Sequence, residues 1–217
     1  MKVLVTGYTG QLGFDVIREL KARNIECIGT TRNEFSLTDT EKMRAFVKAY
    51  KPDVVIHCAA YTAVDKAEDE GKELNTLINE TGTKNVAEAA EAAGATLFYI
   101  STDYVFDGLN QEQYQVNDPA NPQNEYGRAK YAGEQIVQSI SSKYYIIRTS
   151  WVFGEFGNNF VYTMRRLAES YPKLTVVNDQ VGRPTWTRTL AEFLLHLNDV
   201  KAEYGIYHLS NDNSCSW

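Results

Sequence analysis

Cysteines, basic clusters and long apolar runs are all scarce in this sequence of 217 residues. The most apolar stretch, 54–64, is interrupted by His57, Tyr61 and Thr62, so it is too short and too polar to span a bilayer. The formal net charge is -6 and no run of Lys or Arg occurs, so nothing here attracts nucleic-acid phosphates. We therefore expect neither a membrane segment nor a nucleic-acid partner.

The three cysteines do not form a metal-binding or disulfide pattern. Cys27 and Cys58 lie in apolar, strand-like stretches and Cys215 lies near the end, with no CxxC and no Cys/His spacing typical of a metal site. A nucleophilic Cys58 activated by His57 is disfavoured, because neighbours in a strand point to opposite faces. We interpret all three as free thiols and expect no metal-ligating residues among them.

The N-terminus lacks the features of a secretory signal. Met1 and Lys2 lead directly into an apolar strand-like run, without a basic start, a long apolar stretch or a small-residue cleavage site. We therefore expect a cytoplasmic protein. The composition, 43% hydrophobic and 23% charged, excludes disordered, collagenous and coiled-coil chains and predicts an ordinary globular fold with a substantial core.

Strand-like and helix-like segments alternate along the chain, which is typical of βαβ units. Residues 54–56 and 97–100 are continuously apolar, as expected of parallel strands that helices cover on both faces. The pattern predicts an α/β fold with a doubly wound parallel sheet. The expected strands are 2–6, 26–30, 53–57, 96–101, 144–149, 173–177 and 205–209. The expected helices are 12–20, 40–50, 75–93, 124–140, 159–170 and 189–197.

A long segment rich in Asn, Gln and Pro, 107–123, separates two of these units. Long loops in compact domains are uncommon and often functional, so this loop is either a lid or rim of a site or a solvated linker.

The first strand leads into a glycine turn. Gly7, Gly10 and Gly13 form a GxxGxxG pattern between a predicted strand and a predicted helix. Glycines at this place allow a tight turn and close approach of a pyrophosphate to the backbone, and the helix N-terminus adds free N–H groups. This context favours a dinucleotide site over a simple packing turn.

The end of the second strand predicts which dinucleotide binds. NAD-preferring folds carry an acidic residue there, whereas this chain has Thr30, Thr31 and Arg32. An Arg with two hydroxyls suits a 2′-phosphate, so NADPH is favoured over NADH, with NADH as the alternative cofactor. Asp39 either approaches the adenine or caps the helix that begins at Thr40.

A second constellation combines Tyr126 and Lys130, whose spacing places both side chains on one helix face. A buried cation beside the phenol is expected to lower the pKa of Tyr126 and make it a proton donor or acceptor near neutrality. Ser101 and Thr102 end a core strand, where open α/β sheets place ligands. A hydroxyl there can join Tyr126 on a carbonyl oxygen and stabilise the alkoxide that forms during hydride transfer.

Long ordered segments extend this pattern over nearly the whole chain. They are STDYVFDG (101–108), AAYTAVDKAE (59–68), RTSWVFG (148–154), GNNF (157–160) and DQVGRPT (179–185). With the glycine turn and the YxxxK pair, the chain resembles the extended branch of the short-chain dehydrogenase/reductase superfamily, and within it the dTDP-4-dehydrorhamnose reductases. The resemblance implies that NADPH or NADH reduces the C4 ketone of dTDP-4-dehydro-6-deoxy-L-mannose to give dTDP-L-rhamnose for cell-surface polysaccharide.

The resemblance also implies roles for individual residues. The implied catalytic residues are Thr102, Tyr126 and Lys130. The residues expected at the cofactor are Gly7, Gly10, Gln11, Leu12, Arg32, Asp39, Ala59, Ala60 and Tyr61, together with Tyr126 and Lys130. The residues expected at the dTDP-sugar are Thr62, Val64, Tyr104, Trp151, Asn159 and Arg183, with Trp186 as a further candidate.

Two features separate the chain from relatives in the superfamily. Sugar-nucleotide 4,6-dehydratases carry Asp-Glu after the catalytic Thr, whereas the second of these positions is Tyr104 here, which disfavours dehydration and, less firmly, epimerisation. Relatives also continue beyond the position of Trp217. We therefore expect residues 1–150 to form a cofactor-binding Rossmann domain, and 151–217 a small substrate lobe that is truncated and interleaved with the last strands.

Two other functions fit the same residues. One is a non-catalytic NADP-binding regulatory subunit, similar to the β subunit of methionine adenosyltransferase. The other is a reductase of a related 4-keto sugar nucleotide, because close sugars differ only in small pocket contacts. A homodimer is also expected.

Overall fold

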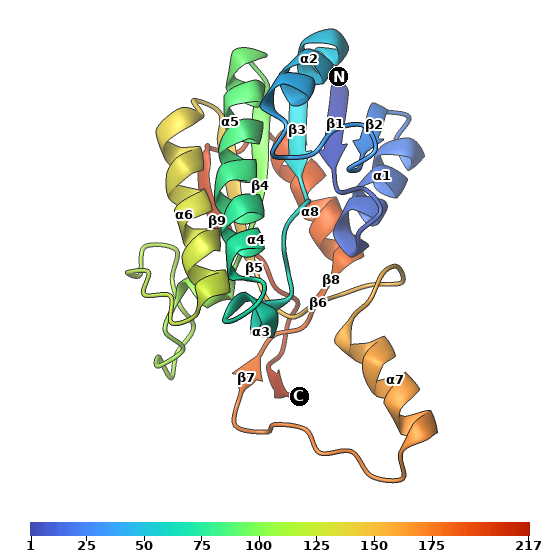
Figure 1. Cartoon of the computed structure of the whole chain (residues 1–217), viewed down its shortest axis with the longest axis vertical. Helices are drawn as coiled ribbons and strands as arrows, with labels where there is room; N and C mark the ends of the chain where they lie inside the picture. The colour runs from blue at the N-terminus through green and yellow to red at the C-terminus, as the bar shows by residue number, and fades with distance from the viewer.

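The computed structural model describes residues 1–217, and its chain alternates strands and helices as expected (Figure 1). The strands are β1 (Lys2–Thr6), β2 (Glu26–Thr30), β3 (Val54–His57), β4 (Thr96–Thr102), β5 (Tyr144–Thr149), β6 (Val152–Phe153), β7 (Val181–Gly182), β8 (Thr185–Trp186), β9 (Gly205–His208) and β10 (Cys215–Ser216). The helices are α1 (Gln11–Ala22), α2 (Thr40–Tyr50), α3 (Val64–Ala67), α4 (Lys72–Thr76), the π-helix η1 (Leu77–Gly82), α5 (Thr83–Ala92), the 3-10 helix η2 (Asp103–Val105), α6 (Glu125–Ile140), α7 (Phe160–Ser170) and α8 (Thr187–Asp199).

Six parallel strands form the central sheet in the order β2-β1-β3-β4-β5-β9. The chain moves outward from β1 to β2, then returns past β1 to β3 and continues in the other direction. The strand order therefore reverses beside β1, and in such sheets ligands bind at the carboxyl ends of the strands at this reversal. This topology confirms the doubly wound α/β fold.

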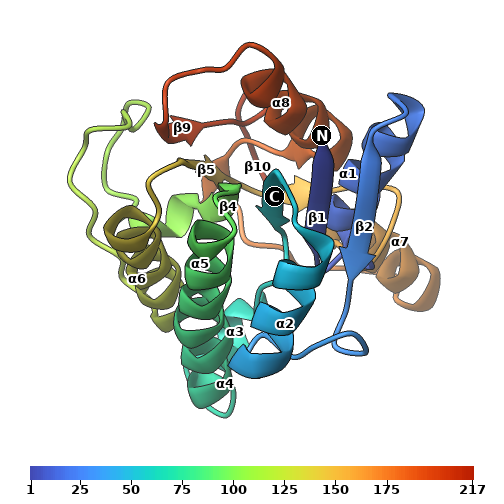
Figure 2. The same cartoon turned by 90° about the horizontal axis from the view of Figure 1, so that it is seen from above.

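Helices cover both faces of the sheet, as Figure 2 shows from above. On one face α1 and α8 pack against the sheet, and the apolar core there includes Val5, Val16 and Leu194. On the other face α2, α5 and α6 enclose a second core that includes Val55 and Leu97. Because alternate residues of each strand enter opposite cores, the middle residues of the central strands are apolar without alternation, and polar residues stand at the strand ends.

Two predicted elements differ in the structure. The expected helix 75–93 is a longer run of α4, η1 and α5, with a π-helical turn at Leu77–Gly82. The expected strand 173–177 is wrong: these residues form no ladder, and Val177 is 54% exposed. Its β-branched residues alone favoured a strand, but no neighbouring strand is present to pair with it.

The long loop 107–123 does not reach the main cleft described below. Tyr114 stacks on Phe106 with ring centroids 4.3 Å apart, and its hydroxyl donates to Asp107 Oδ1 over 2.6 Å. The loop is thus fastened beside β4 and α6, and the expectation of a lid or rim over that cleft is wrong.

The C-terminal third of the chain is divided between the sheet and a projecting part. Strand β9 completes the sheet beside β5, whereas α7 extends away from the body of the molecule (Figure 1). Strands β6 and β8 pair with each other, and β10 pairs with β7. None of the helices has both the length and the apolar character that crossing a membrane requires.

His57, at the end of β3, should make the stability of the fold sensitive to acid. Its ring is buried and shares a 2.7 Å hydrogen bond with Thr6 Oγ1, and burial lowers the pKa of His57 from 6.5 to about 3. Between these values the unfolded chain binds a proton that the folded chain does not, so the free energy of unfolding falls as the pH falls. We expect His57→Gln to reduce this slope by about 1.4 kcal/mol per pH unit.

Urea unfolding at several pH values between 6.5 and about 3 measures this slope. The matched control is His196→Asn on α8, because His196 is exposed, and it should keep the wild-type slope. Equal slopes in His57→Gln and the wild type would contradict the assignment.

Candidate active site

A cleft of about 1260 Å³ opens at the carboxyl ends of the sheet strands. Threonines end four of these strands, and all four line the cleft: Thr6, Thr30, Thr102 and Thr149. The buried hydroxyls of Thr30 and Thr149 have no hydrogen-bond partner within the protein. Because a buried hydroxyl without a partner is unfavourable, these two point to a polar ligand in the cleft.

The glycine turn forms one wall of the cleft. Gly7 has φ +67, and its N–H donates to Thr30 O over 2.8 Å, which ties the turn to the end of β2. A Cβ on Gly7 would lie 2.8 Å from the Ala59 backbone, and one on Gly13 would lie 2.4 Å from Gly7 O. No side chain caps the N-terminus of α1. The turn therefore presents backbone N–H groups to an anion, and its shape fits a dinucleotide pyrophosphate.

Tyr126 and Lys130 reach the cleft from α6, opposite Thr102 at the end of β4. Close packing brings the helix near: a Cβ on Gly127 would lie 2.3 Å from Tyr104 O, and one on Gly133 would lie 2.2 Å from the Tyr99 hydroxyl. The two glycines let α6 approach η2 and β4 closely enough for its side chains to reach the cleft beside Thr102.

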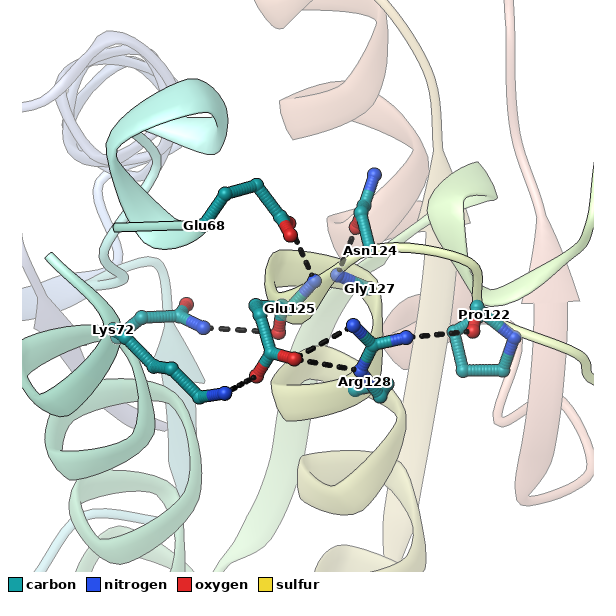
Figure 3. Close-up of polar contacts among 8 residues, drawn as sticks. Glu68, Lys72, Pro122, Asn124, Glu125, Gly127 and Arg128 are labelled. Atoms are coloured by element: carbon teal, nitrogen blue, oxygen red, sulfur yellow. Dashed lines mark hydrogen bonds and ion pairs between the residues drawn. The ribbon is translucent and has the colours of Figure 1, made fainter.

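The first turn of α6 is fixed from several directions (Figure 3). The Asn124 side chain caps the helix by accepting from Gly127 N over 2.6 Å, and Glu125 N donates to Glu68 over 2.7 Å. The Glu125 carboxylate contacts Arg128 at 2.6 Å and Lys72 at 3.3 Å. Since Tyr126 lies between these anchored residues, its backbone has little freedom.

Burial dominates the protonation of the two α6 side chains. It raises the pKa of Tyr126 well above its usual value, Asp103 raises this pKa further, and the hydroxyl of Thr102 opposes the shift. Burial also lowers the pKa of Lys130 to about 7, although Glu134 opposes this. The expected lowering of the Tyr126 pKa by Lys130 is therefore absent: burial and the Asp103 charge raise this pKa, and the hydrogen bond with Thr102 opposes them only in part. Tyr126 is a protonated phenol near neutral pH.

A neighbouring thiol is not activated. Cys58 lines the cleft, but burial raises the pKa of its thiol to about 12. The thiol therefore stays protonated near neutral pH, which argues against a nucleophilic role.

A buried ion pair connects α6 to the central sheet. Arg148 on β5 donates through Nε and Nη2 to the two carboxylate oxygens of Glu134 over 2.9 and 2.7 Å, and Ser101 donates to the same carboxylate. The side chains of Arg148 and Glu134 are 5% and 0% exposed. Arg148 also donates to Val116 O over 3.2 Å. The pair thus joins the helix of Tyr126 and Lys130 to both β4 and β5.

Most of the residues predicted for the sugar side line the same cleft. Thr62, Val64, Tyr104, Trp151 and Asn159 all line it. Trp151 has φ +45, which is unusual for a large side chain and typical of functional sites. The Asn159 side chain also links the two halves of the site.

Three contacts define that link. Asn159 caps α7 by accepting from Tyr162 N over 3.0 Å, and its amide donates to Gln11 Oε1 over 3.1 Å and to Gly154 O over 2.9 Å. Because Gln11 is the first residue of α1, this side chain connects the projecting helix to the glycine turn.

Four predicted residues do not line the cleft: Asp39, Tyr61, Arg183 and Trp186. Asp39 caps α2 by accepting from Lys42 N over 3.1 Å, which was the alternative role considered for it. The hydroxyl of Tyr61 points toward Gly71, where an added Cβ would lie 2.0 Å away. Arg183 contributes only a carbonyl that accepts from Ser150. The remaining predicted residues come together at the cleft, and the roles of all of them stay predictions.

Some cleft residues had no role predicted for them from the sequence, among them Asp103, Thr149 and Trp217. Thr149 and Asp103 line the cleft, and burial raises the pKa of Asp103 to about 6. Thr149 was recognisable as the last residue of a predicted parallel strand. Trp217 stacks on Trp151 with ring centroids 3.6 Å apart, and no local pattern in the sequence indicates this contact.

Fold and site together define an oxidoreductase of the extended short-chain dehydrogenase/reductase type. The family model described as RmlD substrate binding domain matches residues 1–217, so the chain belongs to this family. The resemblance found from the sequence is thereby confirmed.

Individual relatives agree with this assignment. The chain is 43% identical to the spore coat polysaccharide biosynthesis protein SpsK of Bacillus subtilis, with 100% of this chain and 75% of that protein aligned. A dTDP-4-dehydrorhamnose reductase structure from Clostridium acetobutylicum has a TM-score of 0.96 at 46% identity, covering 100% of this chain and 76% of that one. A Bacillus anthracis dTDP-4-dehydrorhamnose reductase structure in complex with NADP has a TM-score of 0.95 at 42% identity, with the same coverage.

The buried ion pair should show strong coupling in a double-mutant cycle. We expect Glu134→Leu and Arg148→Met each to lower the free energy of unfolding by about 3–5 kcal/mol, because each leaves a buried charge without its partner. The double variant should lose less than the sum of the two. Urea unfolding of the wild type, the two single variants and the double variant measures these free energies.

The exposed ion pair between Lys66 and Glu70 provides a control, and Glu70→Gln should leave stability nearly unchanged. Additive losses in the double variant would contradict the coupling.

Proposed function

We propose that this chain uses NADPH to reduce the C4 ketone of dTDP-4-dehydro-6-deoxy-L-mannose, giving dTDP-L-rhamnose. The observation that carries the proposal is the meeting of Thr102, Tyr126 and Lys130 in one cleft at the carboxyl edge of the sheet. Membership of the RmlD family and the likeness to reductases in this family support it.

The cofactor end of the cleft fits an NADP-type dinucleotide. The glycine turn would hold the pyrophosphate, and Arg32 would lie toward the 2′-phosphate. The likeness to a reductase in complex with NADP supports NADPH, and NADH is a second expected cofactor. When bound, the nicotinamide supplies the hydride for the reduction.

The proton comes from the protein. The raised pKa keeps the Tyr126 phenol protonated, so it can donate to the ketone oxygen as negative charge develops there. Thr102 Oγ1 can donate a second hydrogen bond to the same oxygen and stabilise the alkoxide-like transition state. The Lys130 ammonium would bind the ribose hydroxyls and add positive charge near the reacting oxygen.

The two parts of the chain contribute different ends of the site. We infer that residues 1–150 hold the cofactor, whereas 151–217 add Trp151 and Asn159 to the sugar side. Strand β9 belongs to the sheet, which supports the interleaving expected between the two parts. A homodimer remains a prediction, and light scattering on the purified protein tests it.

Tyr126→Phe should separate proton transfer from cofactor binding. We expect turnover to fall by about 10²–10⁴-fold, because the variant lacks the phenolic proton, while the NADPH dissociation constant changes little. The measurement is NADPH absorbance decay with the keto sugar, with cofactor affinity followed by fluorescence. Tyr131→Phe on the same helix is the matched control and should keep normal turnover.

The same assay tests the proposed reaction. It should be run on this chain and on a form extended to the length of the relatives. NADPH consumption in either form supports the reductase, and near-normal turnover of Tyr126→Phe would contradict the role of that residue. No consumption by either form would favour a regulatory subunit or a reductase of another keto sugar.

Lys130 should make cofactor affinity depend on pH. Below its pKa of about 7 the ammonium is charged, and above that value it loses the charge that attracts the dinucleotide. We therefore expect NADPH to bind more weakly as the pH rises from 6 to about 8.5. Fluorescence titrations at these pH values measure the NADPH dissociation constant. In Lys130→Met this constant should depend less on pH, because the titrating ammonium is absent. Identical pH profiles of the two proteins would contradict the assignment.

A further inference from the structure

The turn that follows β2 holds a carboxylate close to the cleft. Thr31 donates to Glu34 Oε2 twice, through its backbone N–H over 2.6 Å and through its hydroxyl over 2.9 Å. The Thr31 hydroxyl in turn accepts from Asn33 N over 3.1 Å. Thr31, Arg32 and Asn33 all line the cleft. Glu34 is therefore part of a hydrogen-bonded turn at the cofactor end of the site.

This arrangement changes the electrostatics expected from the sequence. Residues 30–32 contain no carboxylate. The turn nevertheless places the carboxylate of Glu34 against the backbone N–H of Thr31. The hydrogen bonds from Thr31 lower the pKa of Glu34, so the group is an anion at neutral pH. Neither Glu34 nor Arg32 forms an ion pair within 4.0 Å, so the charges of this turn are not neutralised by a directly paired side chain.

Building on the proposed function, we propose that Glu34 sets the ratio of the affinities for NADPH and NADH. The two cofactors differ only in the 2′-phosphate, and a nearby carboxylate repels this dianion while it tolerates a hydroxyl. Glu34 also occupies the two donors of Thr31 that a phosphate would otherwise use. Arg32 acts in the opposite direction, because its guanidinium attracts phosphate. The opposing charges of Glu34 and Arg32 thus determine the relative affinities for NADPH and NADH.

Neutralising Glu34 should shift this balance toward NADPH. Glu34→Gln keeps an oxygen acceptor for Thr31 but removes the charge, so we expect the NADPH-to-NADH affinity ratio to rise roughly fivefold. Glu34→Ala should also raise the ratio, because it additionally frees the donors of Thr31. Arg32→Gln should lower the ratio roughly tenfold. Dissociation constants come from fluorescence titration with each cofactor, without the sugar.

Glu41→Gln is the matched control, because it makes the same charge change at an exposed position on the first turn of α2 and should leave the ratio unchanged. An unchanged ratio in both Glu34 variants, with NADPH still bound, overturns the role of Glu34 alone and leaves the proposed reductase intact. Failure of the wild type to bind either cofactor overturns both proposals. A thermal melt of each variant checks that the protein still folds.

Discussion

The buried pair of Glu134 and Arg148 is the interaction on which the geometry of the site depends. Removing two charges from water is costly, and here two direct hydrogen bonds and the Ser101 hydroxyl compensate this cost. The strength of the pair depends on its geometry, so it fixes the distance between α6 and the sheet. Lys130 is one helical turn before Glu134, and Ser101 directly precedes Thr102. The same contact thus positions the groups on both sides of the cleft.

Most of the sheet could be predicted from the sequence, because its strands are apolar on both faces and its helices carry regular apolar stripes. Strand 26–30 and helix 40–50 have the bounds that the pattern predicts. The error at 173–177 has a clear cause: a strand needs a partner as well as β-branched residues, and a local pattern contains no information about partners. The short pairs β6–β8 and β7–β10 were missed for the same reason, since each joins distant two-residue segments.

The site was predictable where motifs place residues at strand ends and helix starts, as at Gly7, Thr102 and Tyr126. It was less predictable where the role depends on the direction of a side chain. Asp39 and Tyr61 lie in segments close to the cleft, yet one caps a helix and the other points toward Gly71. Protonation was harder still, because the pKa of Tyr126 depends on how completely the phenol is buried. Sequence spacing shows which groups are close but gives no measure of their hydration.

The position of β9 beside β5 has a consequence for synthesis on the ribosome. Strand β5 leaves the exit tunnel long before β9, because the whole segment from β6 to α8 is translated between them. During that interval β5 is an edge strand with unpaired backbone groups, and Arg148 lacks its neighbour His208. The sheet cannot be completed on this side before β9 has been synthesised, so the β5 edge stays available for pairing until then.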